Sequence, residues 1–223
     1  MKFNISGKSF LKSLVFIRVG AVALAASAYY FMQLLGKKVA RMFSPGQYEV
    51  EKFQVLHVGT VPRFDENIWT LEIYGLVNRP MTLSCRQVRN LPKVASISDF
   101  HYVIGWSKFE NKWEGVRFRT IIEMAEVSAD AKFATIESEY GHKTSLPLED
   151  LSEDDVLPAY RLDEEKLPPE HGGPLRIVVP HKYACKSAKR VRKIKFTQDQ
   201  ELGYWESAGY SNTADPFKDD RYA

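Results

Sequence analysis

A run of 22 mostly apolar residues near the N-terminus, residues 14–35, constrains the fold of this chain more than any other feature. It reads LVFIRVGAVALAASAYYFMQLL and carries one charge, on Arg18. As a helix it would be about 33 Å long, which suffices for a hydrocarbon core of about 30 Å. Arg18 lies near enough to the N-terminal end of the run for its guanidinium to reach the lipid headgroups. The run therefore predicts a single membrane-spanning helix.

The charges beside this run predict its orientation. Five positive charges lie on the N-terminal side, counting the terminal amine and Arg18, which is near the start of the run. Three lie on the C-terminal side. The positive-inside rule then puts the N-terminus in the cytoplasm and the rest of the chain in the periplasm. We expect a single-pass protein of the inner membrane, with a cytoplasmic stub and anchor in residues 1–41. A cleaved signal peptide is the competing interpretation, because Ala26-Ser27-Ala28 forms an AxA-type site.

The rest of the chain is long enough for one folded domain. Residues 42–61 are predicted to be a linker, and residues 62–223 a domain with a sizeable core. The net charge of +3 comes partly from the flanks of the apolar run and from residues 182–195, so nucleic acid is not an expected partner. Cys85 and Cys185 are the two cysteines and lie 100 residues apart, which argues against a zinc or iron–sulfur site.

Short strands mixed with short helices predict an α+β domain. Alternating or continuous apolar residues indicate strands at 69–75, 100–104, 133–137, 175–179 and 191–196. Helices are expected at 84–91, where Ser84 is the predicted cap, at 118–127 and at 148–151. Because residues 175–179 read LRIVV without a polar break, we expect that strand to be central in its sheet.

Three stretches carry a resemblance to a known family. They are DFHYVIGWSKFENKWEGV at 99–116, LPAYRLDEEKLPPEHGGPLRIVVPHKYACKSAK at 157–189 and GYWESAGYSNTADPFKDDRY at 203–222. With FDENIWTLEIYGLVNRPMTL at 64–83, they resemble the sulfite oxidase-like molybdopterin-binding domain. The resemblance covers nearly all of residues 62–222. It implies that family's fold, mixed β-sheets with short helices, C-terminal to the predicted anchor.

The residues themselves indicate a pocket for an anion. Arg176, Lys186 and Lys189, together with Ser187, could bind a phosphate through charge-assisted hydrogen bonds. A solvated surface strand is the other interpretation of this basic run. The resemblance implies that these four residues line a cofactor pocket.

The resemblance adds three more residues to this pocket. His101 and His171 lie in the stretches that line the cofactor in the family, and Tyr102 takes the place of the family's metal-ligating cysteine.

Tyr102 is the departure that matters most. A phenol is a hard, bulky oxygen ligand with an ordinary pKa of about 10, whereas the thiolate is a soft ligand. Cys185 stands where many relatives carry an aromatic residue, and Phe217 replaces a usual tryptophan. The segment at 6–12, SGKSFLK, also resembles a twin-arginine export signal without its arginine pair. We therefore expect no bound molybdenum or molybdopterin, no metal site and no catalytic residue.

Three functions from different classes remain. The first is a pseudoenzyme, a non-catalytic accessory or structural subunit of a respiratory or photosynthetic membrane electron-transfer complex, with the membrane and other subunits as partners. The alternative is an active molybdenum-cofactor oxidoreductase of the sulfite or sulfoxide type, with Tyr102 in place of the cysteine ligand. The third is a periplasmic binding module for an anionic small molecule.

The predicted orientation can be tested on sealed spheroplasts. External protease should digest residues 62–223, because the anchor would leave the domain outside the cytoplasmic membrane. Immunoblotting of the chain before and after detergent lysis measures the digestion. A domain that is protected until lysis would show the reverse orientation.

Overall fold

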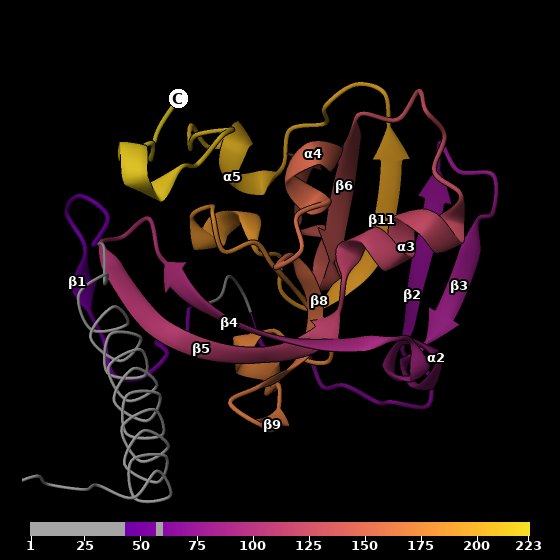
Figure 1. The fold of residues 1–223 in the computed structure, drawn as a ribbon, viewed down its shortest axis with the longest axis horizontal. Coiled ribbons are helices and arrows are strands. Elements are labelled where there is room, and N and C mark those ends of the chain that lie inside the picture. Colours follow the sequence, from indigo (N-terminus) through magenta and orange to yellow (C-terminus); the bar gives the residue numbers. More distant parts are fainter. Residues whose placement is uncertain (1–42, 57–59) are drawn as a thin grey trace, which may run out of the picture. The chain divides into compact units, whose positions relative to one another are not determined.

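The computed structural model describes residues 43–56 and 60–223 (Figure 1). The predicted membrane-spanning helix at residues 14–35 lies outside the described residues. Within the described ranges, no helix is long and apolar enough to cross a membrane. Residues 43–223 form one compact unit.

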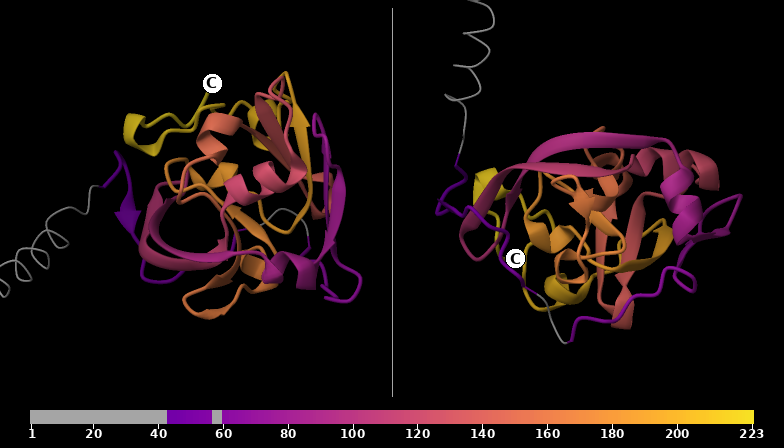
Figure 2. Two further views of the ribbon diagram at one scale, coloured as in Figure 1. Left: turned by 45° about the vertical axis from the view of Figure 1, so that its right-hand side comes forward. Right: turned by 90° about the horizontal axis from the view of Figure 1, so that it is seen from below.

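Two β-sheets form the frame of this unit. The first has the strand order β1-β5-β8-β10, with β4 paired to β5 and β9 paired to β8. Its strands are β1 (Tyr48–Glu49), β4 (Lys93–His101), β5 (Trp106–Val116), β8 (Leu157–Leu162), β9 (Glu165–Lys166) and β10 (Arg176–Val178). Strands β4 and β5 form a long antiparallel hairpin that curves along one side of the unit (Figures 1 and 2).

The second sheet has the order β3-β2-β11-β6-β7. Its strands are β2 (Thr70–Gly75), β3 (Met81–Ser84), β6 (Phe133–Ser138), β7 (Lys143–Pro147) and β11 (Val191–Thr197). Strand β11 pairs in parallel with β2 and antiparallel with β6. Both sheets therefore mix local hairpins with pairings between distant segments, and the expected α+β class of mixed sheets is confirmed.

The helices are short, as the sequence predicts. They are α2 (Cys85–Asn90), α3 (Phe118–Ala125), α4 (Leu148–Leu151) and α5 (Tyr204–Ser207), with 3-10 turns η1 (Glu139–Gly141), η2 (Pro169–His171), η3 (Ala184–Lys186) and η4 (Pro216–Lys218). The predicted cap of α2 is confirmed, because the Ser84 side chain accepts from the Gln87 backbone and the Gln87 side chain accepts from Ser84 in return. Helix α3 ends at Ala125, where Glu126 adopts a left-handed conformation.

Two predicted strands differ from the structure. The strand expected at 100–104 ends at His101, because Gly105, at φ +101°, closes a turn by donating its N–H to the Tyr102 carbonyl. The strand expected to be central, β10, lies at the end of its sheet. It is buried nonetheless, since the Ile177 N–H donates to Ala188 and Leu175 accepts from the Val191 N–H. The chain leading into β11 thus covers its open edge.

The core has two parts. The larger lies around the five-stranded sheet, α2 and α3. The smaller is aromatic and centres on Phe100, Trp106 and Trp113. Phe53 packs against all three rings, with centroids 5.4 to 6.0 Å apart. Residues 43–56, for which the sequence predicts a linker, therefore contribute β1 and an aromatic side chain to the unit.

The C-terminal segment lies over the domain. Tyr183 donates its backbone N–H to Ala214, and Arg221 donates to the carbonyls of Val103 and Pro45. Residues 204–223 are thereby held against both the η3 segment and the chain entering β1.

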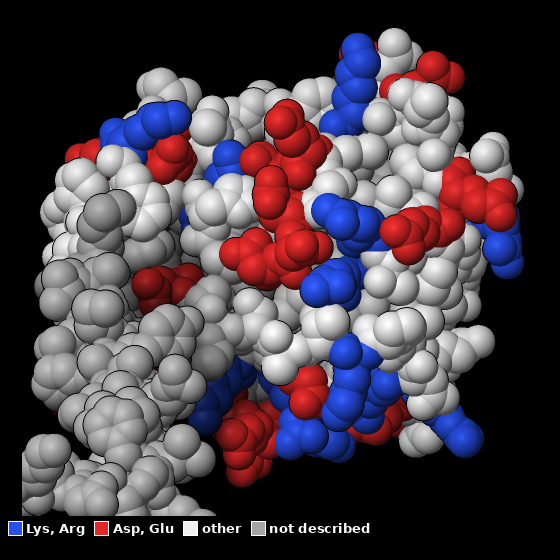
Figure 3. All heavy atoms as spheres, viewed as in Figure 1, with Lys and Arg blue, Asp and Glu red and all other residues white. Residues whose placement is uncertain are grey.

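Acidic and basic side chains are interspersed on the face drawn in Figure 3, with Asp and Glu residues gathered near its middle. Several of the protein's ion pairs have both side chains exposed, such as Arg119 with Asp154 at 3.5 Å. Exposed pairs of this kind contribute little to stability.

Phe53→Ala tests whether residues 43–56 belong to the folded domain. We expect a loss of about 2 kcal/mol in the free energy of unfolding, because the half-buried ring fills a gap in the aromatic cluster. Tyr48→Ala is the control, since its side chain is exposed and its loss should cost no more than about 0.5 kcal/mol. Urea denaturation of both variants measures the difference, and equal stabilities would contradict the role of Phe53.

Candidate functional site

A cavity of about 780 Å³ lies within unit 43–223. Its walls come from the turn after β4, from η1, from η3 and the residues after it, and from α5 and its continuation. Sites for small molecules and cofactors typically enclose about 300 to 1,000 Å³. The cavity is therefore large enough for an organic cofactor.

Strand β4 ends at His101, and the next residue, Tyr102, lies in the turn that lines the cavity. Its ring stacks on Trp106 at a centroid distance of 3.9 Å and an interplanar angle of 21°. The backbone of the turn is fixed too, since the Tyr102 carbonyl accepts from the Gln47 side chain. The phenol is thus a well-positioned part of the wall.

Arg176 is fully buried behind Tyr102. Its guanidinium donates to the Tyr102 hydroxyl at 3.4 Å and to the His171 carbonyl at 2.9 Å. It also lies over the Phe100 ring, 4.5 Å from the centroid. No described carboxylate pairs with it, although a buried charge is normally compensated.

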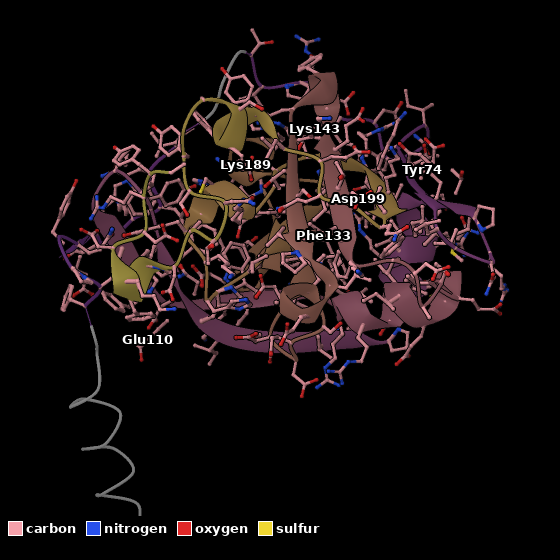
Figure 4. The ribbon with its side chains drawn as sticks, turned by 90° about the horizontal axis from the view of Figure 1, so that it is seen from above. Tyr74, Glu110, Phe133, Lys143, Lys189 and Asp199 are labelled. Atoms are coloured by element: carbon pink, nitrogen blue, oxygen red, sulfur yellow. The ribbon has the colours of Figure 1, made fainter. Side chains whose placement is uncertain are left out.

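Two further cations belong to this cluster, and both line the cavity. Burial, together with repulsion from Arg176 and Arg190, lowers the pKa of Lys189 to about 7. Burial and the charge of Arg176 also lower the pKa of Arg190. The Lys189 ammonium donates only to the carbonyls of Leu56 and Glu170 among the described residues. Figure 4 labels Lys189, which lies near the C-terminal segment drawn in yellow. A bound anion would offset the repulsion among these cations.

Ser187 joins Lys189 in the cavity wall. Its hydroxyl oxygen accepts from the Val179 N–H at 3.0 Å, so its proton is available to a ligand. Lys186, by contrast, is turned away into a buried ion pair with Glu206, whose carboxylate also accepts from the Thr144 hydroxyl at 2.7 Å. The structure therefore gives Lys186 a partner within the chain.

The two predicted histidines do not line the cavity. His101 is buried, and its Nδ1 lies 2.8 Å from the Ser107 hydroxyl. His171 packs against the Phe53 ring, and burial lowers its pKa, as do the charges of Lys189 and Arg176. Both are neutral groups that support the site from behind.

Several cavity residues were not among the predicted site residues, and Cys185 is the most informative. The residue lines the cavity, and burial raises the pKa of its thiol to about 11. Cys85 lies instead in the larger core cluster. The signal for Cys185 was present in the sequence, because a cysteine stands there where many relatives carry an aromatic residue.

One wall of the cavity is aromatic. The His142 ring lies 4.5 Å from the Tyr204 ring at a tilt of 35°, and Trp205 meets Tyr210 edge-on at 5.2 Å. Burial lowers the pKa of His142, so the imidazole is neutral at pH 7. The cavity thus joins an apolar wall, a cationic wall, a thiol and a phenol. This donor set fits a molybdopterin, whose phosphate needs cations and whose metal accepts soft ligands.

Comparison with known proteins agrees with this arrangement. Residues 58–205 match the family model described as "Oxidoreductase molybdopterin binding domain". The chain is 43% identical over 179 residues to "Uncharacterized oxidoreductase YuiH" of Bacillus subtilis, covering 80% of this chain and 90% of that protein.

Two further relatives have more specific names. "Protein-methionine-sulfoxide reductase catalytic subunit MsrP" of Campylobacter jejuni is 26% identical, covering 86% of this chain and 75% of the relative. "Putative protein-methionine-sulfoxide reductase subunit YedZ1" of Azospira oryzae is 27% identical, over 68% of this chain and 57% of the relative.

A solved structure shares the fold. It is the sulfane dehydrogenase SoxCD of Paracoccus pantotrophus, with a TM-score of 0.58 and 21% identity. The match covers 63% of this chain and 41% of that one.

Two expectations are therefore wrong. We expected a non-catalytic accessory subunit, but these relatives are named oxidoreductases, one of them a catalytic subunit. We also expected no cofactor, but the matching family is defined by molybdopterin binding. Both expectations were drawn from Tyr102 and from the other departures from the family pattern, and they did not take into account that Cys185 lines the same cavity.

The cationic cluster predicts that sulfate stabilises the cofactor-free protein more at pH 6 than at pH 8.5. Lys189 is protonated below its pKa of about 7 and neutral above it, so the anion meets an additional charge at the lower pH. Melting temperatures in sodium sulfate, against sodium chloride of equal ionic strength, measure the effect. Lys189→Met should remove the pH dependence.

Lys195→Met is the control, because Lys195 belongs to the same basic run but pairs with Glu201 at 2.6 Å. It should leave the response to sulfate unchanged. Equal stabilisation by sulfate at both pH values in the unmodified protein would contradict the role of Lys189.

Proposed function

Since the chain belongs to the oxidoreductase molybdopterin-binding domain family, we propose that it is an active molybdopterin-dependent oxidoreductase that reduces sulfoxides. The observation that carries the proposal is the cavity itself, whose wall includes Cys185 and the neighbouring cations Lys189 and Arg190. Bound molybdopterin would supply the two-electron transfer of an oxygen atom. The chain must then bind the cofactor, orient the substrate and exclude water.

The cationic wall would hold the phosphate of the cofactor. Lys189 and Arg190 line the cavity without a carboxylate partner among the described residues, and Ser187 adds a hydroxyl donor. A dianion there would raise the lowered pKa of Lys189 and relieve its repulsion with Arg190. Lys186 contributes indirectly, because its ion pair with Glu206 holds the η3 segment in place.

Cys185 would hold the metal. It is the cysteine that lines the cavity, whereas Cys85 is buried in the other core cluster. The Tyr102 oxygen already accepts a hydrogen bond from Arg176, which makes it the poorer ligand. Since the free thiol has a pKa of about 11, it is protonated at neutral pH, and the metal would displace that proton on binding.

The aromatic wall supports a sulfoxide as the substrate. The alkyl groups on a sulfoxide sulfur are apolar and pack well against aromatic rings, which His142, Tyr204 and Trp205 supply in the cavity wall. Two relatives named as protein-methionine-sulfoxide reductases support the same class. We place the enzyme at the periplasmic face of the inner membrane, anchored by residues 14–35, with a membrane subunit as its electron donor.

Metal analysis combined with an activity assay tests the proposal. The protein purified from cells that make molybdopterin should contain about one molybdenum per chain and should reduce N-acetylmethionine sulfoxide with a chemical electron donor. Cys185→Ser should lose most of the metal, because a hydroxyl is a harder and less acidic ligand than a thiol. X-ray absorption of any remaining metal should show one sulfur ligand fewer.

Cys85→Ser is the matched control, since it removes the other thiol from a site remote from the cavity. It should retain the molybdenum and the activity if it folds. If the purified protein contains no molybdenum, the proposed function is overturned. If Cys185→Ser leaves the metal content unchanged, the proposed ligand is overturned.

A further inference from the structure

The side chain of Tyr102 has an unused hydrogen-bond donor. Its only hydroxyl partner among the described residues is Arg176, at 3.4 Å. A guanidinium has five N–H donors and no acceptor, so the phenol oxygen must accept this bond. The phenolic proton is then free for another acceptor, and Tyr102 lines the cavity.

Arg176 makes this donor stronger. The guanidinium is fully buried among the rings of Phe100, Trp113 and Phe53, and no described carboxylate neutralises it. Its positive charge polarises the phenol that accepts from it, as happens in chains of hydrogen bonds within a low-dielectric interior. An electron-rich ligand atom beside the phenol would also compensate a buried charge that the chain leaves unpaired.

The phenol is held rigidly in this role. Its ring lies against Trp106 at 3.9 Å and beside Phe100 at 5.6 Å, and only 9% of the residue is exposed. The backbone of Tyr102 is fixed at the same time, by its N–H bond to the Trp106 carbonyl at 2.8 Å. A donor positioned in this way loses little conformational freedom when a ligand binds.

We propose that Tyr102 is a substrate-binding residue that donates its phenolic hydrogen bond to the oxygen of the sulfoxide group. This inference rests on the proposed function for the identity of the substrate. The S–O bond places negative charge on oxygen, which suits a donor polarised by Arg176. The alkyl groups on sulfur then face the aromatic wall of His142, Tyr204 and Trp205. The product sulfide has no oxygen, so Tyr102 favours the substrate over the product.

Equilibrium binding without an electron donor tests this role apart from turnover. Calorimetric titration of the metal-loaded protein with N-acetylmethionine sulfoxide and with N-acetylmethionine compares two ligands that differ by one oxygen. Tyr102→Phe should weaken binding of the sulfoxide about tenfold, the effect of one hydrogen bond to a polarised group. Binding of the sulfide should change less than about twofold. The phenyl ring retains its packing on Trp106, so the variant should fold and load metal normally.

Tyr140→Phe is the matched control. Tyr140 lines the same cavity, but its side chain is largely exposed and no hydrogen bond to Arg176 polarises it. It should bind both ligands as the unmodified protein does. If Tyr102→Phe weakens the binding of sulfoxide and sulfide equally, its role is purely structural and the inference is overturned. The inference is also overturned if the binding of neither ligand is weakened.

The two proposals fail in different ways. If the loaded enzyme does not reduce the sulfoxide, the proposed function is wrong, whatever Tyr102 does. If it does reduce the sulfoxide but Tyr102→Phe binds both ligands normally, only the role of Tyr102 is wrong. In an active enzyme, Tyr102→Phe should also raise KM for the sulfoxide about tenfold, with a metal content equal to that of the unmodified protein.

Discussion

The ion pair between Lys186 and Glu206 is the interaction on which the cavity depends. It joins η3 to α5, two segments 20 residues apart that form facing parts of the cavity wall, and the Thr144 hydroxyl connects the pair to β7. Both side chains are almost fully buried, so removing one partner would leave a charge in a low-dielectric interior. The pair therefore helps to hold α5 against η3, and both segments contribute to the cavity wall.

The second constraint is a group of cations that, unlike Lys186, have no carboxylate partner among the described residues. Arg176, Lys189 and Arg190 are brought together with backbone carbonyls as partners and no ion pair to a described carboxylate. Burial, together with repulsion from Arg176 and Arg190, lowers the pKa of Lys189 to about 7. Lys186 thus has a carboxylate partner within the chain, whereas Lys189, three residues later, has only backbone carbonyls as partners among the described residues.

The replacement of a ligand at one position is weak evidence about the activity of a whole site. Tyr102 removes a thiol from the turn after β4, but Cys185 introduces one into the same cavity from η3. Tyr102 in turn brings a phenol into contact with a buried guanidinium. Because a cavity is lined by segments far apart in the chain, such exchanges are visible only when its wall is considered as a whole.

The sequence by itself determined the α+β class, the capped helix α2, the helix α4 and the strands β2 and β6, because local periodicity and capping depend on neighbouring residues. The family followed from motifs at 99–116, 157–189 and 203–222, and three of the predicted site residues, Tyr102, Ser187 and Lys189, line the cavity. Only the tertiary structure decided the rest. It placed β10 at a sheet edge, turned Lys186 toward Glu206 and brought Cys185 into the cavity that Tyr102 lines. Each of these depends on contacts between residues distant in the chain, and local sequence patterns do not encode such contacts.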